Sequence, residues 1–388
     1  MTVVILDGKR TPYGKWNGAL AGYNAVSLAS KPLTHLIEKY PTLGTIDGVI
    51  LAQVIQAGQG QNPARQVAFQ AGLDSRIPAM TVNNVCLGGV ATVIDAVRRI
   101  KLGEGNTYIV GGMDSMSNAP YVIPKPKPKD FGHQQMTDTL LRDGLSCALS
   151  EQSMGVLTEQ YNPSFHITRE EQDNIAFLSQ TRAAKARDAG RLAEEIVPFD
   201  QVLVEDEGIR PQTTLDKLAG LSPVFAKDGT ITAGNASQMT DGASVGIVTT
   251  SAKAEELNTE PLACVKDWAE TAGPDTSLQT KPADAIEMVL KQQKLTVEDI
   301  DLFEINEAFA SVVIASANQL SISEDKLNVN GGAIAIGHPL GGTGFRLVLT
   351  LAYELRRRGG GKGIAALCGG GGQGIAILIE VNGKGDKA

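Results

Sequence analysis

Short apolar runs alternate along the chain with longer stretches whose apolar residues recur at helical spacing. Residues 48–55 and 107–110 form continuous apolar runs of strand length, and the second ends at a pair of glycines. Residues 23–39 and 282–292 place apolar side chains on one face of a helix. Strands that alternate with helices predict an α/β sheet of largely parallel strands.

The pattern changes at about residue 116. Residues 120–150 are rich in proline and polar groups, and a helix is predicted only from Thr168, where Thr168-Arg-Glu-Glu-Gln172 has the pattern of a capping box. This helix extends to about Ala189. A regular α/β pattern returns with a strand at 242–249. The middle of the chain therefore reads as a loop-rich insert on an α/β body.

Two parts of the chain repeat one order of features. Residues 82–112 contain a strand, Val-Asn, Leu-Gly-Gly, an apolar helix ending in arginines, a strand and Gly-Gly. Residues 329–370 repeat Val-Asn, Leu-Gly-Gly, helix, strand and Gly-Gly in the same order. The repeat predicts two similar βαβ-rich units packed together, with ligands at the carboxyl ends of strands.

Length, charge and cysteine content narrow the function classes. The chain has 388 residues, which is enough for two or three domains, and a formal net charge of -8, which disfavours a nucleic-acid surface. Its four cysteines are far apart and form no metal-ligand or disulfide spacing. With no signal-peptide pattern and no membrane-spanning apolar run, we expect a cytoplasmic protein without a metal site.

Three side chains at predicted strand ends could carry chemistry. Cys86 sits between a strand and a helix, where the helix N-terminus favours a thiolate and a lowered pKa. His338 stands on a glycine-rich turn at another helix entrance, and Cys368 precedes four glycines whose amides could hold an oxyanion. Each also has a structural reading, as a buried cysteine or an incidental histidine. For Asn306, at a helix start, the structural reading is slightly favoured.

Four motifs occur in order along nearly the whole chain. They are Val85-Cys-Leu-Gly-Gly89, Asn306-Glu-Ala-Phe309, Gly332-Ala-Ile-Ala-Ile-Gly-His338-Pro339 and Cys368-Gly-Gly-Gly-Gly-Gln-Gly374. Together these motifs resemble the thiolase family. The resemblance implies the family's fold: two pseudo-repeated βαβ-rich halves in a layered α/β/α/β/α arrangement with a loop-rich insert. The expected division is 1–115 plus 240–260 for the N-terminal half, 116–239 for the insert and 261–388 for the C-terminal half.

The resemblance implies a role for each candidate residue. Cys86 would take an acyl group from an acyl-CoA, and His338 would activate it and then help hold the oxygen of the second thioester. Asn306 would hold a water in that oxyanion hole, and Cys368 would move the α-carbon proton. The backbone amides of Cys86 and Gly370 would form the other oxyanion hole.

Substrates and assembly follow from the same resemblance. Ser237 would contact the pantetheine arm of coenzyme A, and Arg210 and Phe225 its nucleotide end. We expect an acyltransferase of fatty-acid metabolism that condenses two acetyl-CoA to acetoacetyl-CoA, or runs the reverse thiolysis, with no cofactor beyond its substrates. A homodimer or homotetramer is implied.

Other functions remain open on the sequence alone. The first alternative is a degradative thiolase that cleaves longer 3-ketoacyl-CoA. Cys368 argues against a ketoacyl-synthase-like enzyme. The complete set of reactive residues argues against a non-catalytic CoA- or lipid-binding relative. Leu87, Gly88, Ser153 and Leu278 depart from the family pattern near the expected substrate channel, which leaves acyl-length preference open.

Overall fold

The computed structural model describes residues 1–125, 127 and 132–383, and its first half alternates strands with helices as predicted. The predicted insert and C-terminal half each include a few residues outside this described part, so their boundaries stay a prediction. The elements of the first half are β1 (Val3–Arg10), α1 (Ala25–Lys39), β3 (Gly48–Ala52), α2 (Pro63–Gln70), β4 (Ala79–Val82), α3 (Gly88–Leu102), β5 (Thr107–Ser115) and β10 (Thr240–Thr250), with the short β2 (Gly14–Lys15) beside β10.

The second half repeats this order, which confirms the predicted internal repeat. A single bridge between Leu327 and Phe303 stands where the first half has β4. The elements are β11 (Ala263–Ala272), α8 (Lys281–Gln293), β12 (Leu302–Ile305), α9 (Ala310–Leu320), α10 (Ala333–Ile336), α11 (Leu340–Arg357), β13 (Gly361–Gly369) and β14 (Gln373–Val381).

The strands form a mixed sheet, so the expectation of largely parallel strands is wrong. In the described residues the order is β12-β13-β14-β11-β1-β10-β5-β3-β4, and only β3 with its two neighbours and β12 with β13 pair in parallel. The physical reason lies in the connections. A glycine turn joins β13 directly to β14, and such a hairpin can only produce an antiparallel pair.

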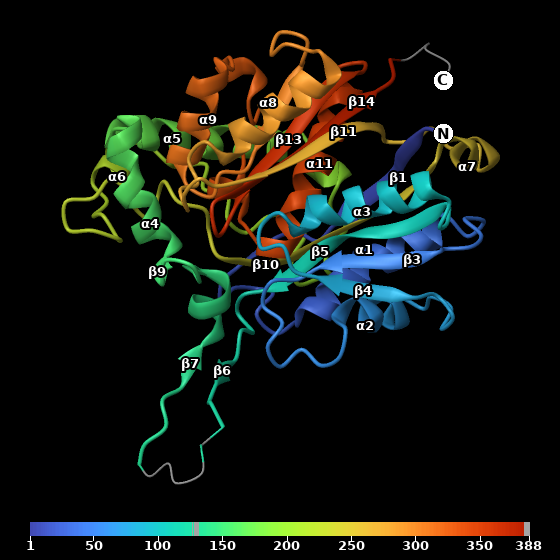
Figure 1. Cartoon of the computed structure of the whole chain (residues 1–388), viewed down its shortest axis with the longest axis horizontal. Helices are drawn as coiled ribbons and strands as arrows, with labels where there is room; N and C mark the ends of the chain where they lie inside the picture. The colour runs from blue at the N-terminus through green and yellow to red at the C-terminus, as the bar shows by residue number, and fades with distance from the viewer. Residues whose placement is uncertain (126, 128–131, 384–388) are drawn as a thin grey trace.

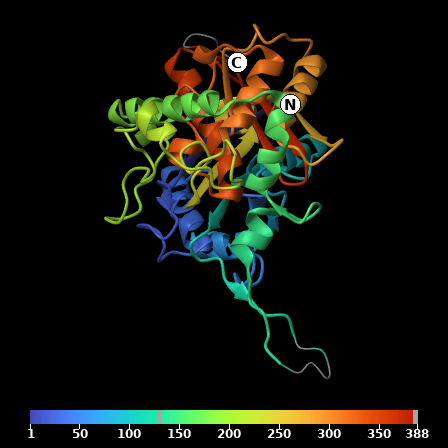
Figure 2. The same cartoon turned by 90° about the vertical axis from the view of Figure 1, so that its left-hand side faces the viewer.

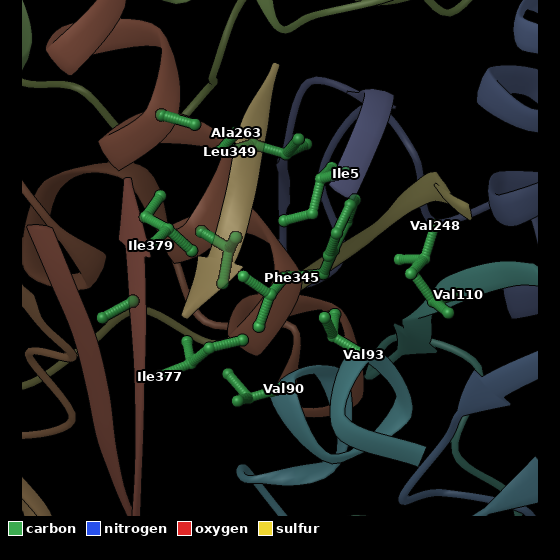
Figure 3. Close-up of a cluster of buried hydrophobic side chains, with 14 of the residues drawn as sticks. Ile5, Val90, Val93, Val110, Val248, Ala263, Phe345, Leu349, Ile377 and Ile379 are labelled. Atoms are coloured by element: carbon green, nitrogen blue, oxygen red, sulfur yellow. The ribbon is translucent and has the colours of Figure 1, made fainter. Parts of the chain in front are cut away.

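The two halves pack through one central pair of helices. α3 and α11 lie between the two parts of the sheet, with α8 and α9 outside one part and α1 and α2 outside the other (Figure 1). Phe345 of α11 meets Val90 and Val93 of α3 and Ile377 of β14 in a buried apolar cluster (Figure 3). The result is the layered α/β/α/β/α arrangement that the resemblance implied.

Glycines let α3 and α11 approach closely at their N-terminal ends. A Cβ atom added at Gly89 would lie 2.6 Å from the backbone nitrogen of Phe345 and 3.0 Å from the Cα of Gly344. A Cβ added at Gly344 would lie 2.7 Å from the nitrogen of Val90. The distances of 2.6 and 2.7 Å are shorter than real Cβ contacts, so only glycine at these two positions permits backbone-to-backbone helix packing.

The insert covers one side of this body. It contains the short strands β6 (Tyr121–Val122) and β7 (Thr137–Asp138), which stand away from the body, and the helices α4 (Met154–Tyr161), α5 (Arg169–Asp188) and α6 (Leu215–Ala219) (Figures 1 and 2). The predicted capping box of α5 is present, with Thr168 and Glu171 capping each other's backbone amides.

A buried ion pair fastens the insert to the first strand. Arg10 is fully buried, and its guanidinium donates to both carboxylate oxygens of Asp206, at 2.6 and 2.8 Å, and to Glu195 at 2.8 Å. Such bidentate pairs fix geometry as well as charge.

Among the described residues no helix has the length and apolar character needed to cross a membrane.

Replacement of Gly89 by alanine tests the helix contact. We expect Gly89→Ala to lower the free energy of unfolding by about 1–3 kcal/mol, because the added methyl group forces α3 away from α11. Urea unfolding followed by circular dichroism measures this difference. Gly22→Ala is the matched control, since a Cβ there meets no atom within 4 Å. Equal stability of the two variants would contradict the proposed contact.

Candidate active site

A cavity of about 850 Å³ opens where the two halves and the insert meet. The three reactive side chains predicted from the sequence, Cys86, His338 and Cys368, all line it, and so do Gly370 and Ser237. They come from the loop before α3, the loop before α11, the end of β13 and the end of the insert. The structure therefore brings together residues that are widely separated in the sequence.

A strained turn presents Cys86 to this cavity. The preceding residue, Val85, has a φ of 48°, a left-handed conformation that β-branched residues rarely adopt. The Asn83 side chain accepts from the Val85 amide at 3.0 Å, and the Leu87 amide donates to the Asn84 carbonyl at 3.0 Å. Backbone strain held by surrounding bonds is typical of functional sites.

His338 is held so that one ring nitrogen faces Cys86. Its Nε2 lies 3.3 Å from the Cys86 sulfur and 3.4 Å from the side-chain nitrogen of Asn306. Asn306 is fully buried, directly after β12. The Asn306 side-chain nitrogen is a donor, so its contact with Nε2 favours the tautomer in which Nε2 is unprotonated and can accept the proton of the Cys86 thiol.

Thr343 fixes this tautomer from the other side of the ring. Nδ1 of His338 lies 2.6 Å from the Thr343 hydroxyl oxygen, and that hydroxyl donates its one hydrogen to the Pro339 carbonyl at 3.1 Å. The Thr343 oxygen is thereby left as the acceptor for Nδ1–H. Sequence reasoning did not identify Thr343. It could have been found as a hydroxyl residue about one and a half helical turns after the histidine.

Burial keeps the Cys86–His338 pair uncharged. Loss of solvent raises the pKa of the Cys86 thiol to about 12, and the negative charge of Asp114 adds to this. Burial lowers the pKa of His338 to about 3, and the positive charge of Arg346 adds to that. The lowered thiol pKa expected from the helix N-terminus is wrong in sign, because desolvation outweighs the helix dipole here.

Cys368 ends β13 and leads into the glycine turn. It is 1% exposed, and burial raises its pKa above the ordinary value for a thiol. Gly371 and Gly372 have φ angles of 82° and 71°, so this turn requires glycine. Gly370 of the same turn lines the cavity beside Cys86. The turn can therefore present backbone amides to a bound carbonyl oxygen.

The predicted coenzyme A contacts fall in two places. Ser237 lines the cavity, whereas Arg210 lies in a separate groove of about 260 Å³ that also contains Lys217. Phe225 packs edge-to-face against Phe309, with ring centroids 6.1 Å apart, near the cavity wall. A long substrate could follow this path from Cys86 to the outside of the insert.

The four departures from the family pattern have different surroundings. Leu87 is buried in the central core beneath Gly369, and Gly88 packs against Ala52, so neither residue belongs to the cavity wall. Ser153 caps α4, and only Leu278 lines the cavity.

Two further features of the site escaped the sequence. Asp114 at the end of β5 accepts from the amides of Val54, Ile55 and Gly341, and so ties a cavity loop to the start of α11. In the sequence, Asp114 could have been noticed as an acidic residue directly after Gly-Gly-Met. Cys147 also lines the cavity. The described residues contain no cluster of three or more histidine, cysteine or acidic side chains that could hold a metal.

Comparison with known proteins shows one family throughout. Residues 3–252 match the family model "Thiolase, N-terminal domain" and residues 259–381 match "Thiolase, C-terminal domain". A probable acetyl-CoA acetyltransferase of Mycolicibacterium smegmatis is 44% identical, covering 94% of this chain and 97% of its own length. Acetyl-CoA acetyltransferase of Cupriavidus necator is 41% identical, covering 97% and 99%.

Solved structures agree with this assignment. The crystal structure of the Bacillus anthracis acetyl-CoA acetyltransferase superposes with a TM-score of 0.94 at 36% identity, covering 98% of both chains. Human mitochondrial 3-ketoacyl-CoA thiolase superposes with a TM-score of 0.93, also at 36% identity and 98% coverage of both chains.

The uncharged Cys86–His338 pair predicts a simple pH dependence. Because the thiol pKa is raised, the thiolate fraction, and so the rate of alkylation of Cys86 by iodoacetamide, should rise about tenfold per pH unit between pH 6 and 9. Mass spectrometry of the Cys86 peptide gives the rate free of the other cysteines. A plateau below pH 7 would instead indicate a thiolate–imidazolium pair.

Proposed function

The chain belongs to the thiolase family, and on that premise we propose that it transfers acyl groups between coenzyme A thioesters through an acyl-Cys86 intermediate. The observation that carries this proposal is the meeting of Cys86, His338 and Asn306 at 3.3 and 3.4 Å on one side of a cavity that Cys368 also lines. A nucleophile, a base and a second thiol are the parts that condensation of two thioesters needs.

In the first half-reaction, the Cys86 sulfur bonds to the thioester carbon of acyl-CoA while its proton passes to Nε2 of His338. The carbonyl oxygen becomes an oxyanion held by the amides of Cys86 and Gly370. The carbon–sulfur bond to coenzyme A then breaks, and the leaving thiolate takes the proton of Cys368. Acyl-Cys86, an imidazolium and a Cys368 thiolate remain.

In the second half-reaction, the Cys368 thiolate removes a proton from the α-carbon of acetyl-CoA. A thiolate whose pKa is raised by burial is a strong base for this weak carbon acid. The enolate oxygen accepts from Nε2–H of His338 and from a water held by Asn306. The enolate carbon then bonds to the acyl carbon. Cys86 leaves as a thiolate and recovers its proton from His338.

The proposed net reaction is condensation of two acetyl-CoA to acetoacetyl-CoA and coenzyme A, or its reverse. The names of the relatives at 41–44% identity support the two-carbon acyl group. The second candidate is thiolytic cleavage of longer 3-ketoacyl-CoA. It is supported by the close superposition on a 3-ketoacyl-CoA thiolase and by a cavity with the apolar side chains of Leu145, Met154 and Leu278 in its wall.

Three further proposals accompany this function. A cytoplasmic location suits a mechanism that needs both Cys86 and Cys368 as thiols, because a reducing compartment preserves them. A homodimer or homotetramer remains the proposed assembly. The reaction as written needs no metal or other cofactor, since protein groups carry every proton and hold both oxyanions.

Thiolysis of 3-ketoacyl-CoA of graded chain length, with wild type and Cys86→Ala, tests the function directly. Loss of the nucleophile should lower kcat by at least about 10⁴-fold, and the wild-type rate should be the same with and without EDTA. Cleavage by Cys86→Ala at the wild-type rate would exclude the acyl-Cys86 intermediate. Among the substrates, the four-carbon one should have the highest kcat/KM, whereas a rise with chain length would favour the degradative alternative.

Thr343 provides a test of the histidine tautomer. Thr343→Val removes the acceptor for Nδ1–H and should lower kcat/KM by about 10–100-fold, as loss of an orienting partner commonly does. Thr343→Ser keeps the hydroxyl and should stay within about threefold of wild type. If valine and serine variants are equally active, the Nδ1–Thr343 contact does not set the tautomer.

A further inference from the structure

A buried lysine lies behind the catalytic cavity. Lys281, at the start of α8, is only 2% exposed. Its ammonium donates to the Gly273 carbonyl at 2.5 Å and lies 3.8 Å from the Asp284 carboxylate and 4.0 Å from that of Asp275. Burial of an ammonium is unfavourable unless it is paired and hydrogen-bonded. The buried ammonium of Lys281 therefore depends on these contacts for its stability.

Lys281 links the two ends of one segment, residues 272–281, and so closes it into a loop. Ala272 and Leu278 of this segment line the catalytic cavity. The bond from the ammonium to the Gly273 carbonyl joins the end of the segment to its beginning. Leu278 is also the position at which the sequence departs from the family pattern inside the cavity. The lysine thus fixes the loop that presents an acyl-facing side chain.

A second set of bonds ties this segment to the insert. The Gln279 side chain is fully buried and donates to the Thr158 carbonyl and to the Asn162 side-chain oxygen, each at 2.9 Å. Thr158 belongs to α4, which begins at the cavity residue Met154. Gln279 therefore anchors the segment to the insert, and Lys281 anchors it on the opposite side.

On that opposite side the segment supports the glycine turn after Cys368. The Gly273 amide donates to the Gly372 carbonyl at 2.9 Å. A Cβ atom added at Gly372 would lie 2.0 Å from the Asp275 carbonyl oxygen, and one added at Gly374 would lie 2.2 Å from that of Lys281. The turn that contains Gly370 thus contacts the beginning of the segment that Lys281 closes, and the start of β14, directly after the turn, contacts its end.

From these contacts we propose that Lys281 is a positioning residue that sets acyl-length preference and turnover by holding the 272–281 wall against the Gly370 turn. The proposal rests on the thiolase function proposed above. Without the ammonium, the Gly273 carbonyl loses its buried donor, and Asp275 and Asp284 lose the cation between them. The segment then relaxes away from the turn, Leu278 recedes from the cavity, and the Gly370 amide shifts from the oxyanion.

Lys281→Met tests this, with thiolysis of acetoacetyl-CoA and 3-ketohexanoyl-CoA as the readout. We expect kcat for acetoacetyl-CoA to fall about 5–20-fold, because misplaced oxyanion donors stabilise the transition state less. KM for coenzyme A should stay within about twofold, since Ser237 and Arg210 are not on this segment. The six-carbon to four-carbon ratio of kcat/KM should rise about threefold or more, as expected when an apolar wall recedes.

Lys266→Met is the matched control. It also removes a lysine ion pair, to Glu380 at 2.7 Å, but at an exposed position on β11 that has no contact with the segment. Its kcat and chain-length ratio should equal those of wild type. A Lys281→Met variant that is indistinguishable from this control would overturn the proposal. Wild-type enzyme without thiolysis of any substrate would instead overturn the proposed function.

Rates are expressed per mole of Cys86 that can be acylated, so unfolded molecules do not contribute. Asp284→Asn is measured in parallel, because it weakens the charge pairing of the same ammonium without removing it. It should raise the chain-length ratio in the same direction, by a smaller factor. An unchanged ratio in Asp284→Asn would contradict the proposal even if Lys281→Met failed to fold.

Discussion

The close backbone packing of α3 and α11 is the constraint on which the active site depends. Cys86 precedes one helix and His338 the other, so the separation of their reactive atoms is set by how near the two N-terminal ends can come. Gly89 and Gly344 have no side chains, and this lets the two helix backbones touch there. The 3.3 Å distance between Cys86 sulfur and His338 nitrogen is thus a consequence of helix packing in the centre of the molecule.

The same central position determines the electrostatics. Because the site is enclosed between the two halves and the insert, desolvation raises the pKa of both thiols and lowers that of His338. A buried neutral pair needs no counter-ion. In the proposed reaction, charge forms only when a thioester supplies an oxyanion and the glycine turn supplies amides to hold it. In the same proposal, the raised pKa of Cys368 makes its thiolate basic enough for carbon chemistry.

Two peripheral segments are fastened around this central contact. The insert is fastened through the buried Arg10 ion pairs, and the 272–281 segment through Lys281 and Gln279. The insert and this segment of the C-terminal half both contribute residues to the cavity wall. Substrate preference can therefore change through these segments while the contact of α3 with α11, and the chemistry that it positions, stays the same.

Local sequence patterns were enough to predict the elements, the repeat and the reactive residues. Apolar spacing, glycine pairs and the four motifs are local patterns, and they place Cys86, His338, Asn306 and Cys368 at element ends without any knowledge of packing. The roles of these residues stay predictions, because the geometry shows only that they meet.

The interactions among those residues depend on the packing of distant parts of the chain. The partner of His338 Nδ1, the inward direction of Leu87 and the sign of the Cys86 pKa shift all depend on atoms that the chain brings in from elsewhere. Cys86 and His338 are 252 positions apart, and no local pattern specifies their distance or their burial. Desolvation is a property of the packed molecule, and for that reason the helix-terminus argument, which is local, predicted the wrong charge state.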